Sequence, residues 1–128
     1  AARAVGAQMP CVISPRAHVS RHAAVGIGTL VLHGAVVNAA AWVSNNVIVN
    51  SLALIEHDAE VGDHCHIATG ARVNGNVTIG TGCFIGSGAV LKNGITIGEG
   101  SVIGAGAVVR HDIPAGSLVP STQQRNPV

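Results

Sequence analysis

Aliphatic residues recur at every sixth position of this chain, from Ile13 to Val109, without a break. The residue two places before each of them is mostly Ala, Cys or Ser, and the residue three places after it is often Gly in the middle and at the end of the series. A period of six fits neither an amphipathic helix nor a strand that simply alternates. It is typical of a parallel β-helix, in which one short strand and one turn recur in every hexapeptide.

The directions of the side chains explain this composition. Residues of a strand alternate between two sides, so the aliphatic residue and the small residue two places earlier both face the interior. Glycine after the aliphatic residue supplies the positive φ of a sharp turn without a clash at Cβ. Three hexapeptides make one coil of a triangular prism, so residues eighteen apart stack at roughly 4.8 Å. The sequence therefore predicts an all-β fold, a parallel β-helix of about six coils.

The unbroken register predicts a single domain in three parts: a lead-in segment at residues 1–12, the β-helix at 13–119 and a polar tail at 120–128. After Val109 the aliphatic series fails at Ala115. Pro114, just before it, lacks the N–H that a ladder hydrogen bond needs. Because the chain begins with Ala rather than Met, we expect a further segment upstream.

Composition excludes several classes of partner. The net charge is +1, and Trp42 and Phe84 are the only aromatic residues, so we expect no nucleic-acid partner. The chain has no run of eighteen apolar residues and no secretory leader, so we expect no membrane partner and a cytoplasmic location. Cys11, Cys65 and Cys83 share one column of inward small positions. We expect free buried thiols, although Cys65 and Cys83 stack closely enough for a bridge.

The outward residue of each hexapeptide falls into one of three columns, one for each face of the prism. The first two columns are largely apolar, which is too much exposed apolar surface for a single prism in water. Self-association with closed symmetry is therefore expected. The first column contains Val12, Leu30, Ile48, His66, Phe84 and Val102, the second His18, Val36, Leu54, Arg72, Val90 and Val108, and the third Ala24, Trp42, Glu60, Thr78 and Thr96.

One histidine lies between two carboxylates, in the run Glu56-His57-Asp58. A carboxylate held against one ring nitrogen fixes the tautomer and raises the basicity of the other nitrogen, which suits a general base. The alternative is a solvated, charged turn without a catalytic role, and the residues by themselves favour that alternative.

The run from Ile55 to Ala68 resembles the sugar acetyltransferases of sialic acid and bacillosamine pathways, which are left-handed β-helix acyltransferases. Gly75–Gly80, Phe84–Gly86 and Ile103–Val109 resemble the same family, and the similarity covers about residues 9–119. The Glu-His-Asp turn followed nine residues later by histidine is its most specific part. The resemblance implies a left-handed helix and an enzyme that transfers acetyl from acetyl-CoA to an amine or hydroxyl of a sugar, which is often nucleotide-linked.

The resemblance also implies roles for single residues. His57 resembles the general base that takes a proton from the acceptor, and Asp58 resembles the residue that raises its basicity. His66 resembles the histidine at the acetyl-thioester end of the coenzyme. The resemblance also places Gly75 in the cofactor site. Gly75 lies one coil after His57, where a side chain would intrude on the acceptor.

The backbone amides of Ser87 and Ala105 match those that contact the pantetheine arm of the coenzyme. They are eighteen residues apart, so they stack on one edge, as a linear ligand along the coils requires. No metal ion is expected.

The positions of the two candidate histidines imply an assembly. His57 lies on the edge between the second and third columns, whereas His66 projects from the first. A single chain cannot easily close a site around both, so we expect a composite site between subunits, and the resemblance makes the assembly a homotrimer. Face composition would bury the first and second faces together, whereas the resemblance puts an open coenzyme groove on the edge that joins them. The sequence leaves open which faces meet.

The chain departs from this family in two places. No segment of residues 1–128 resembles the family's N-terminal domain, whose glycine-rich loop binds the nucleotide-sugar, and Ser117–Ser121 replaces the usual C-terminal ending, so the sugar acceptor is not fixed. A non-catalytic scaffold or an ice-binding prism is an alternative, but only Thr78 and Thr96 stack as a threonine ladder. A β-helix carbonic anhydrase is less favoured still, because it needs two histidine ligands five residues apart, and no two histidines here have that spacing.

Overall fold

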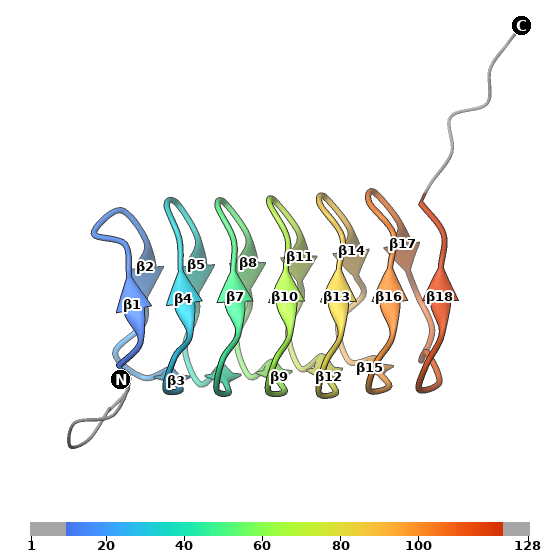
Figure 1. Ribbon diagram of the computed structural model, residues 1–128, viewed down its shortest axis with the longest axis horizontal. Helices are drawn as coiled ribbons and strands as arrows, with labels where there is room; N and C mark the ends of the chain where they lie inside the picture. The colour runs from blue at the N-terminus through green and yellow to red at the C-terminus, as the bar shows by residue number, and fades with distance from the viewer. Residues whose placement is uncertain (1–9, 122–128) are drawn as a thin grey trace, which may run out of the picture.

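The computed structural model describes residues 10–121. They form eighteen strands of two residues each, and the strands stack into three parallel sheets that are the sides of a prism (Figure 1). The fold is thus the predicted all-β solenoid of about six coils. The described residues form no helix that is long and apolar enough to cross a membrane.

The first sheet contains β1 (Val12–Ile13), β4 (Leu30–Val31), β7 (Ile48–Val49), β10 (His66–Ile67), β13 (Phe84–Ile85), β16 (Val102–Ile103) and β18 (Leu118–Val119). The second sheet contains β2 (His18–Val19), β5 (Val36–Val37), β8 (Leu54–Ile55), β11 (Arg72–Val73), β14 (Val90–Leu91) and β17 (Val108–Val109). The third sheet contains β3 (Ala24–Val25), β6 (Trp42–Val43), β9 (Glu60–Val61), β12 (Thr78–Ile79) and β15 (Thr96–Ile97).

The hand of the coil follows from the path of the chain. Strands of the first sheet face the viewer in Figure 1 and run upward. The chain then crosses the upper edge to the second sheet behind, returns along the lower edge and advances from left to right. A path of this sense is left-handed, as the resemblance implied, and opposite to the usual hand of parallel crossovers.

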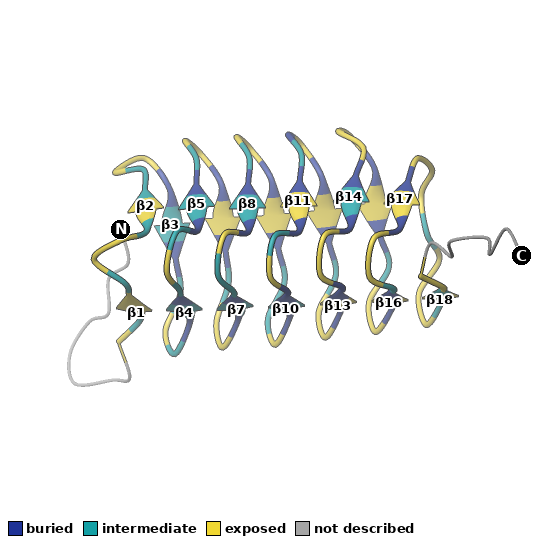
Figure 2. Ribbon diagram, turned by 90° about the horizontal axis from the view of Figure 1, so that it is seen from above, coloured by how far each residue is buried: buried dark blue, intermediate teal, exposed yellow. Residues whose placement is uncertain are grey.

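The register confirms the three predicted columns. Residues eighteen apart are Cα partners, for example His66 with Phe84 in the first sheet and Trp42 with Glu60 in the third. Figure 2 shows the resulting alternation of buried and exposed residues along every coil. The inward aliphatic and small residues are buried from Ala23 to Val109.

The last coil is two residues shorter than the others. Val102 pairs with Leu118, sixteen residues later, and Ile113 forms a bridge with the third sheet. The aliphatic series fails at Ala115 as predicted, and that residue is exposed. The next aliphatic residue of the series is Ile113, two positions earlier than a period of six requires. Ile113 and Val119 pack against the core and close its C-terminal end.

Small polar residues at the inward positions just before the strands of the first sheet have a role that the sequence did not predict. The side chains of Thr29, Cys65, Cys83 and Ser101 donate hydrogen bonds to backbone carbonyl oxygens, at 2.7, 3.1, 3.2 and 3.0 Å. Buried carbonyl groups need such partners. Cys65 and Cys83 are free buried thiols, as predicted, whereas Cys11 is free but only partly buried. The neighbouring Cys83 thiol and, to a smaller extent, burial raise the pKa of Cys65, which keeps that thiol neutral.

Most turns place their second residue at positive φ, and glycine usually occupies this position, as predicted. Six residues at such positions are not glycine. An L-residue in this conformation costs roughly 1–2 kcal/mol relative to glycine, so each exception invites an explanation. The six are Ala40, Asn46, Leu52, Asp58, His64 and Asn76.

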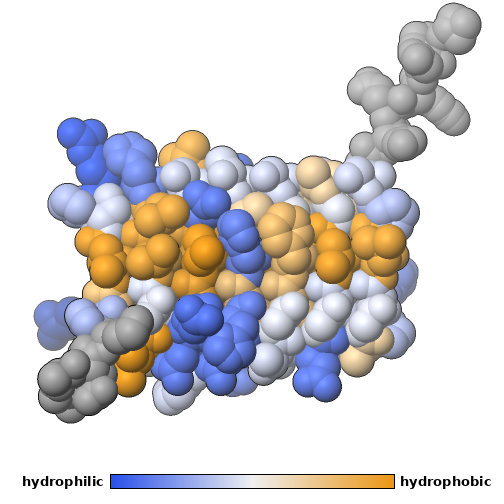
Figure 3. Space-filling view, viewed as in Figure 1, coloured by the Kyte–Doolittle hydropathy of each residue, from blue (hydrophilic) through white to orange (hydrophobic). Residues whose placement is uncertain are grey.

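An apolar band runs along the outside of the first sheet (Figure 3). Val12, Phe84, Val102 and Leu118 are all exposed there, with fractions from 39% to 73%. Hydrophilic side chains interrupt the band near its middle. The predicted excess of apolar surface on this face is therefore present.

Candidate active site

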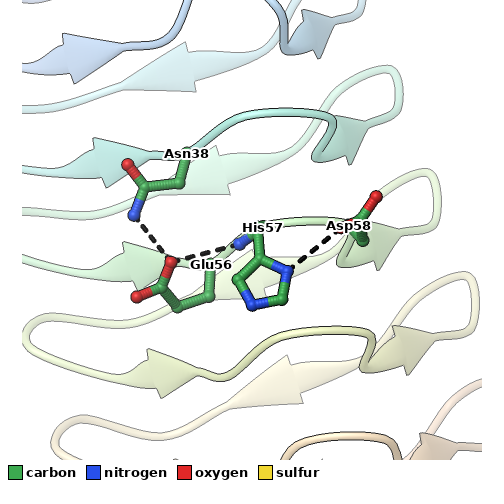
Figure 4. A network of polar contacts seen from close by, with 4 residues as sticks. All are labelled: Asn38, Glu56, His57 and Asp58. Atoms are coloured by element: carbon green, nitrogen blue, oxygen red, sulfur yellow. Dashed lines mark hydrogen bonds and ion pairs between the residues drawn. The ribbon is translucent and has the colours of Figure 1, made fainter.

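His57 lies in the turn between β8 and β9, on the edge where the second and third sheets meet. Asp58 occupies the positive-φ position of this turn, and its Oδ2 lies 3.0 Å from His57 Nδ1 (Figure 4). Because a carboxylate only accepts hydrogen bonds, Nδ1 is the donor, and in the neutral imidazole Nε2 carries the lone pair. The two side chains are 58% and 54% exposed, so the pair is accessible to a substrate and adds little to stability.

Glu56 holds the backbone of the same turn. Its Oε1 accepts hydrogen bonds from the backbone N–H of His57 at 3.1 Å and from Asn38 Nδ2 at 2.7 Å. Figure 4 shows Glu56 between Asn38 and the His57 backbone, while Asp58 lies on the ring side. Sequence reasoning noted Glu56 only as a flanking carboxylate and missed Asn38. The spacing of eighteen residues between Asn38 and Glu56 is the signal that could have found this contact.

Gly75 lies directly against the imidazole of His57. A Cβ built on Gly75 would lie 2.6 Å from His57 Nε2 and 2.7 Å from Cε1, both well inside contact distance. The φ of Gly75 is not positive, so space rather than backbone conformation accounts for glycine here. A side chain at Gly75 would therefore collide with His57 itself, and its obstruction of the acceptor stays a prediction.

His66 projects from β10 on the first sheet. Its Nε2 lies 3.2 Å from Asn50 Nδ2, and its ring meets Phe84 edge to face with centroids 5.1 Å apart. These two contacts fix the ring and leave it half-buried. Asn50 is a further residue that sequence reasoning missed. Its Oδ1 also accepts the backbone N–H of Ser51 at 2.7 Å.

Ser87 and Ala105 are exposed in turns on the edge between the first and second sheets. Among the described residues, neither backbone N–H has a hydrogen-bond acceptor. The residue before each is glycine, Gly86 and Gly104, which offers no side-chain oxygen of the kind that Asn50 gives Ser51. Two backbone amides one coil apart, both in exposed turns, therefore keep their hydrogen-bonding capacity for a ligand.

The structure brings some predicted site residues together and separates others. His57, Asp58 and Gly75 form one cluster on the edge between the second and third sheets. His66 lies on the first sheet, and Ser87 and Ala105 lie on a different edge. Within one chain these are two half-sites on different sides of the prism.

A hollow of about 270 Å³ lies on the third sheet beside Trp42, Asn45 and Asp63, and it contains none of the predicted site residues. Within residues 10–121 no group of three or more His, Cys, Asp or Glu side chains is placed to hold a metal ion.

Comparison with known proteins supports the repeat and the fold. Residues 76–111 match the family model described as bacterial transferase hexapeptide (six repeats). Residues 76–111 therefore match the hexapeptide repeat of bacterial transferases, and the described residues fold as a left-handed β-helix.

Solved structures of acetyltransferases share the fold over nearly the whole chain. The acetyltransferase domain of PglB from Neisseria gonorrhoeae is 41% identical, with a TM-score of 0.87, and the match covers 88% of this chain and 55% of that one. The same domain has been solved with acetyl coenzyme A. PerB from Caulobacter crescentus, in complex with CoA and GDP-perosamine, is 34% identical, with a TM-score of 0.87 and coverage of 88% and 55%.

A more distant structure shows the same fold alone. AntD, an N-acyltransferase from Bacillus cereus in complex with dTDP and 3-hydroxybutyryl-CoA, is 14% identical with a TM-score of 0.81, over 90% of this chain and 77% of that one. The chain spans about 55% of the PglB and PerB chains that it matches.

Proposed function

We propose that this chain is the acetyl-transferring part of a sugar acetyltransferase that uses acetyl-CoA as donor. The observation that carries the proposal is the His57–Asp58 pair, with Nε2 free beside the space that Gly75 leaves. The similarity to the acetyltransferase domain of PglB, solved with acetyl coenzyme A, and to PerB, solved with CoA and GDP-perosamine, supports it. The acceptor is an amine or hydroxyl of a sugar or nucleotide-linked sugar.

The proposed reaction is direct acyl transfer. The acceptor nitrogen or oxygen attacks the thioester carbonyl carbon while His57 Nε2 removes its proton. Asp58 accepts the Nδ1 hydrogen bond and stabilises the imidazolium that forms. The tetrahedral intermediate collapses with cleavage of the C–S bond, and the sulfur of CoA leaves with the proton that His57 returns. Acetylated sugar and free CoA are the products, and no oxidant, reductant or metal ion is required.

The coenzyme is proposed to lie along the edge between the first and second sheets. The free N–H groups of Ser87 and Ala105 are suited to bind the pantetheine amide oxygens. His66, fixed by Asn50 and Phe84, would then lie near the thioester.

A composite site between subunits would unite the two half-sites. His57 of one subunit would face the coenzyme groove of its neighbour in a homotrimer, and the exposed apolar residues of the first sheet supply surface for association. Free thiols at Cys65 and Cys83 fit a reducing compartment, and we propose the cytoplasm.

The proposal is tested by incubating the protein with acetyl-CoA and a panel of 4-amino-sugar nucleotides and amino sugars, while CoA release is followed with a thiol reagent. Acceptor-dependent release of CoA, with acetylated sugar found by mass spectrometry, is the expected result. Calorimetry with acetyl-CoA alone gives a second readout. Absence of binding would contradict the proposal and favour a non-catalytic scaffold.

A further inference from the structure

Leu52 is an exception on the edge proposed to bind the coenzyme. In the other coils, the positive-φ position on this edge is occupied by glycine. In one coil it is Leu52, with φ +63°. Its side chain is 63% exposed, so the core does not require it. Glycine would make the same backbone hydrogen bond to His33 without the cost of this conformation. The glycines are Gly34, Gly70, Gly88 and Gly106.

The space along this edge changes at Leu52. A Cβ built on Gly70 or Gly88 would have no heavy atom within 4 Å, so the edge is open on the C-terminal side of Leu52. On the other side, a Cβ built on Gly34 would lie 2.5 Å from Leu52 Cδ2. The leucine side chain therefore covers Gly34, and the open part of the edge, which includes Gly70 and Gly88, ends at Leu52.

The series of backbone N–H groups without an acceptor ends at the same turn. The N–H groups of Thr69, Ser87 and Ala105, each eighteen residues apart, have no acceptor among the described residues. One coil earlier, the N–H of Ser51 donates a hydrogen bond to Asn50 Oδ1. The Asn50 side chain also contacts His66, so the turn that carries Leu52 adjoins the histidine proposed to lie at the thioester.

We propose that Leu52 is the end wall of the coenzyme groove and restricts the donor to short acyl groups, acetyl above all. The inference rests on the proposed function. A pantetheine arm that runs from Ala105 past Ser87 toward His66 points its acyl group at the coil of Leu52. That coil is roughly 4.8 Å further along the prism. An acetyl methyl ends before it, whereas a butyryl or hexanoyl chain meets the leucine.

The test measures the affinity of acetyl-CoA, butyryl-CoA and hexanoyl-CoA for the parent, Leu52→Ala and Leu52→Gly by calorimetry. We expect the parent to prefer acetyl-CoA to hexanoyl-CoA. Removing the side chain should raise the hexanoyl-to-acetyl affinity ratio by about 10–100-fold, the range for steric exclusion from an apolar site. Leu52→Gly also removes the unfavourable backbone conformation, so it should fold at least as well as the parent.

Asn46→Gly is the matched control, because it places glycine at another positive-φ position on a different edge. Its hexanoyl-to-acetyl ratio should equal that of the parent. Equal affinity of the parent for hexanoyl-CoA and acetyl-CoA would overturn the inference, as would an unchanged ratio in both Leu52 variants. Failure of the parent to bind acetyl-CoA would instead overturn the proposed function together with this inference.

Discussion

Replacement of Gly75 by alanine should displace the imidazole of His57 without unfolding the protein. The new methyl carbon would lie 2.6 Å from His57 Nε2, whereas an ordinary contact needs about 3.4 Å, so the ring must retreat by nearly 1 Å. A misplacement of about 1 Å at a reacting group costs on the order of a hundredfold in rate. We therefore expect kcat/KM for acetyl transfer to fall about a hundredfold.

Stability should change little in the same variant. The His57 side chain is more than half exposed and is free to move into solvent, and alanine suits the backbone because the φ of Gly75 is not positive. The free energy of unfolding should change by less than about 1 kcal/mol, measured by thermal or urea denaturation. Acetyl-CoA affinity, measured by calorimetry, should show whether any loss lies in coenzyme binding instead.

A double-mutant cycle isolates the cause. If Gly75 is needed to leave room for the ring, Gly75→Ala should have no further effect on kcat/KM once His57 is alanine. Full activity of Gly75→Ala would refute the reasoning, and so would a further large loss when it is added to His57→Ala.

Three other predictions address the groove, the turn and the assembly. Ala105→Trp should abolish acetyl-CoA binding in calorimetry while leaving the melting temperature unchanged, because the bulky group projects from an exposed turn. Asp58→Gly should raise the free energy of unfolding by about 1 kcal/mol in urea titrations and should lower kcat. Ala40→Gly changes the equivalent position one coil earlier, so it should stabilise the protein by a similar amount and leave kcat unchanged. Light scattering should give the mass of a trimer at micromolar concentration, and a stable monomer would contradict the shared site.

Much of the fold follows directly from the period of the sequence. A repeat of six with an inward aliphatic residue fixes which residues stack. The eighteen-residue coil alone therefore predicts that Trp42 lies beside Glu60 and that His66 lies beside Phe84. The shortened last coil does not follow, because Ile113 and Val119 fall outside the repeat. Only pairing with the preceding coil shows that they continue the core.

The candidate site was less predictable. The position of His57 on an edge follows from the register, but its contact with Asp58 depends on the positive φ of an aspartate, where the pattern leads one to expect glycine. The links from Glu56 to Asn38 and from His66 to Asn50 are side-chain contacts between neighbouring coils. A hexapeptide pattern places such residues near each other without specifying their rotamers.

The central claim is that His57 is the general base of an acetyl transfer. The most direct measurement compares acetyl transfer by the parent and by His57→Ala on one acceptor, with acetyl-CoA affinity measured on the same samples. Loss of a general base lowers the rate by about 10²–10⁴-fold. We expect a loss of that size in kcat with coenzyme affinity and oligomeric state retained. Full turnover by His57→Ala on an acceptor that the parent acetylates would contradict the assignment.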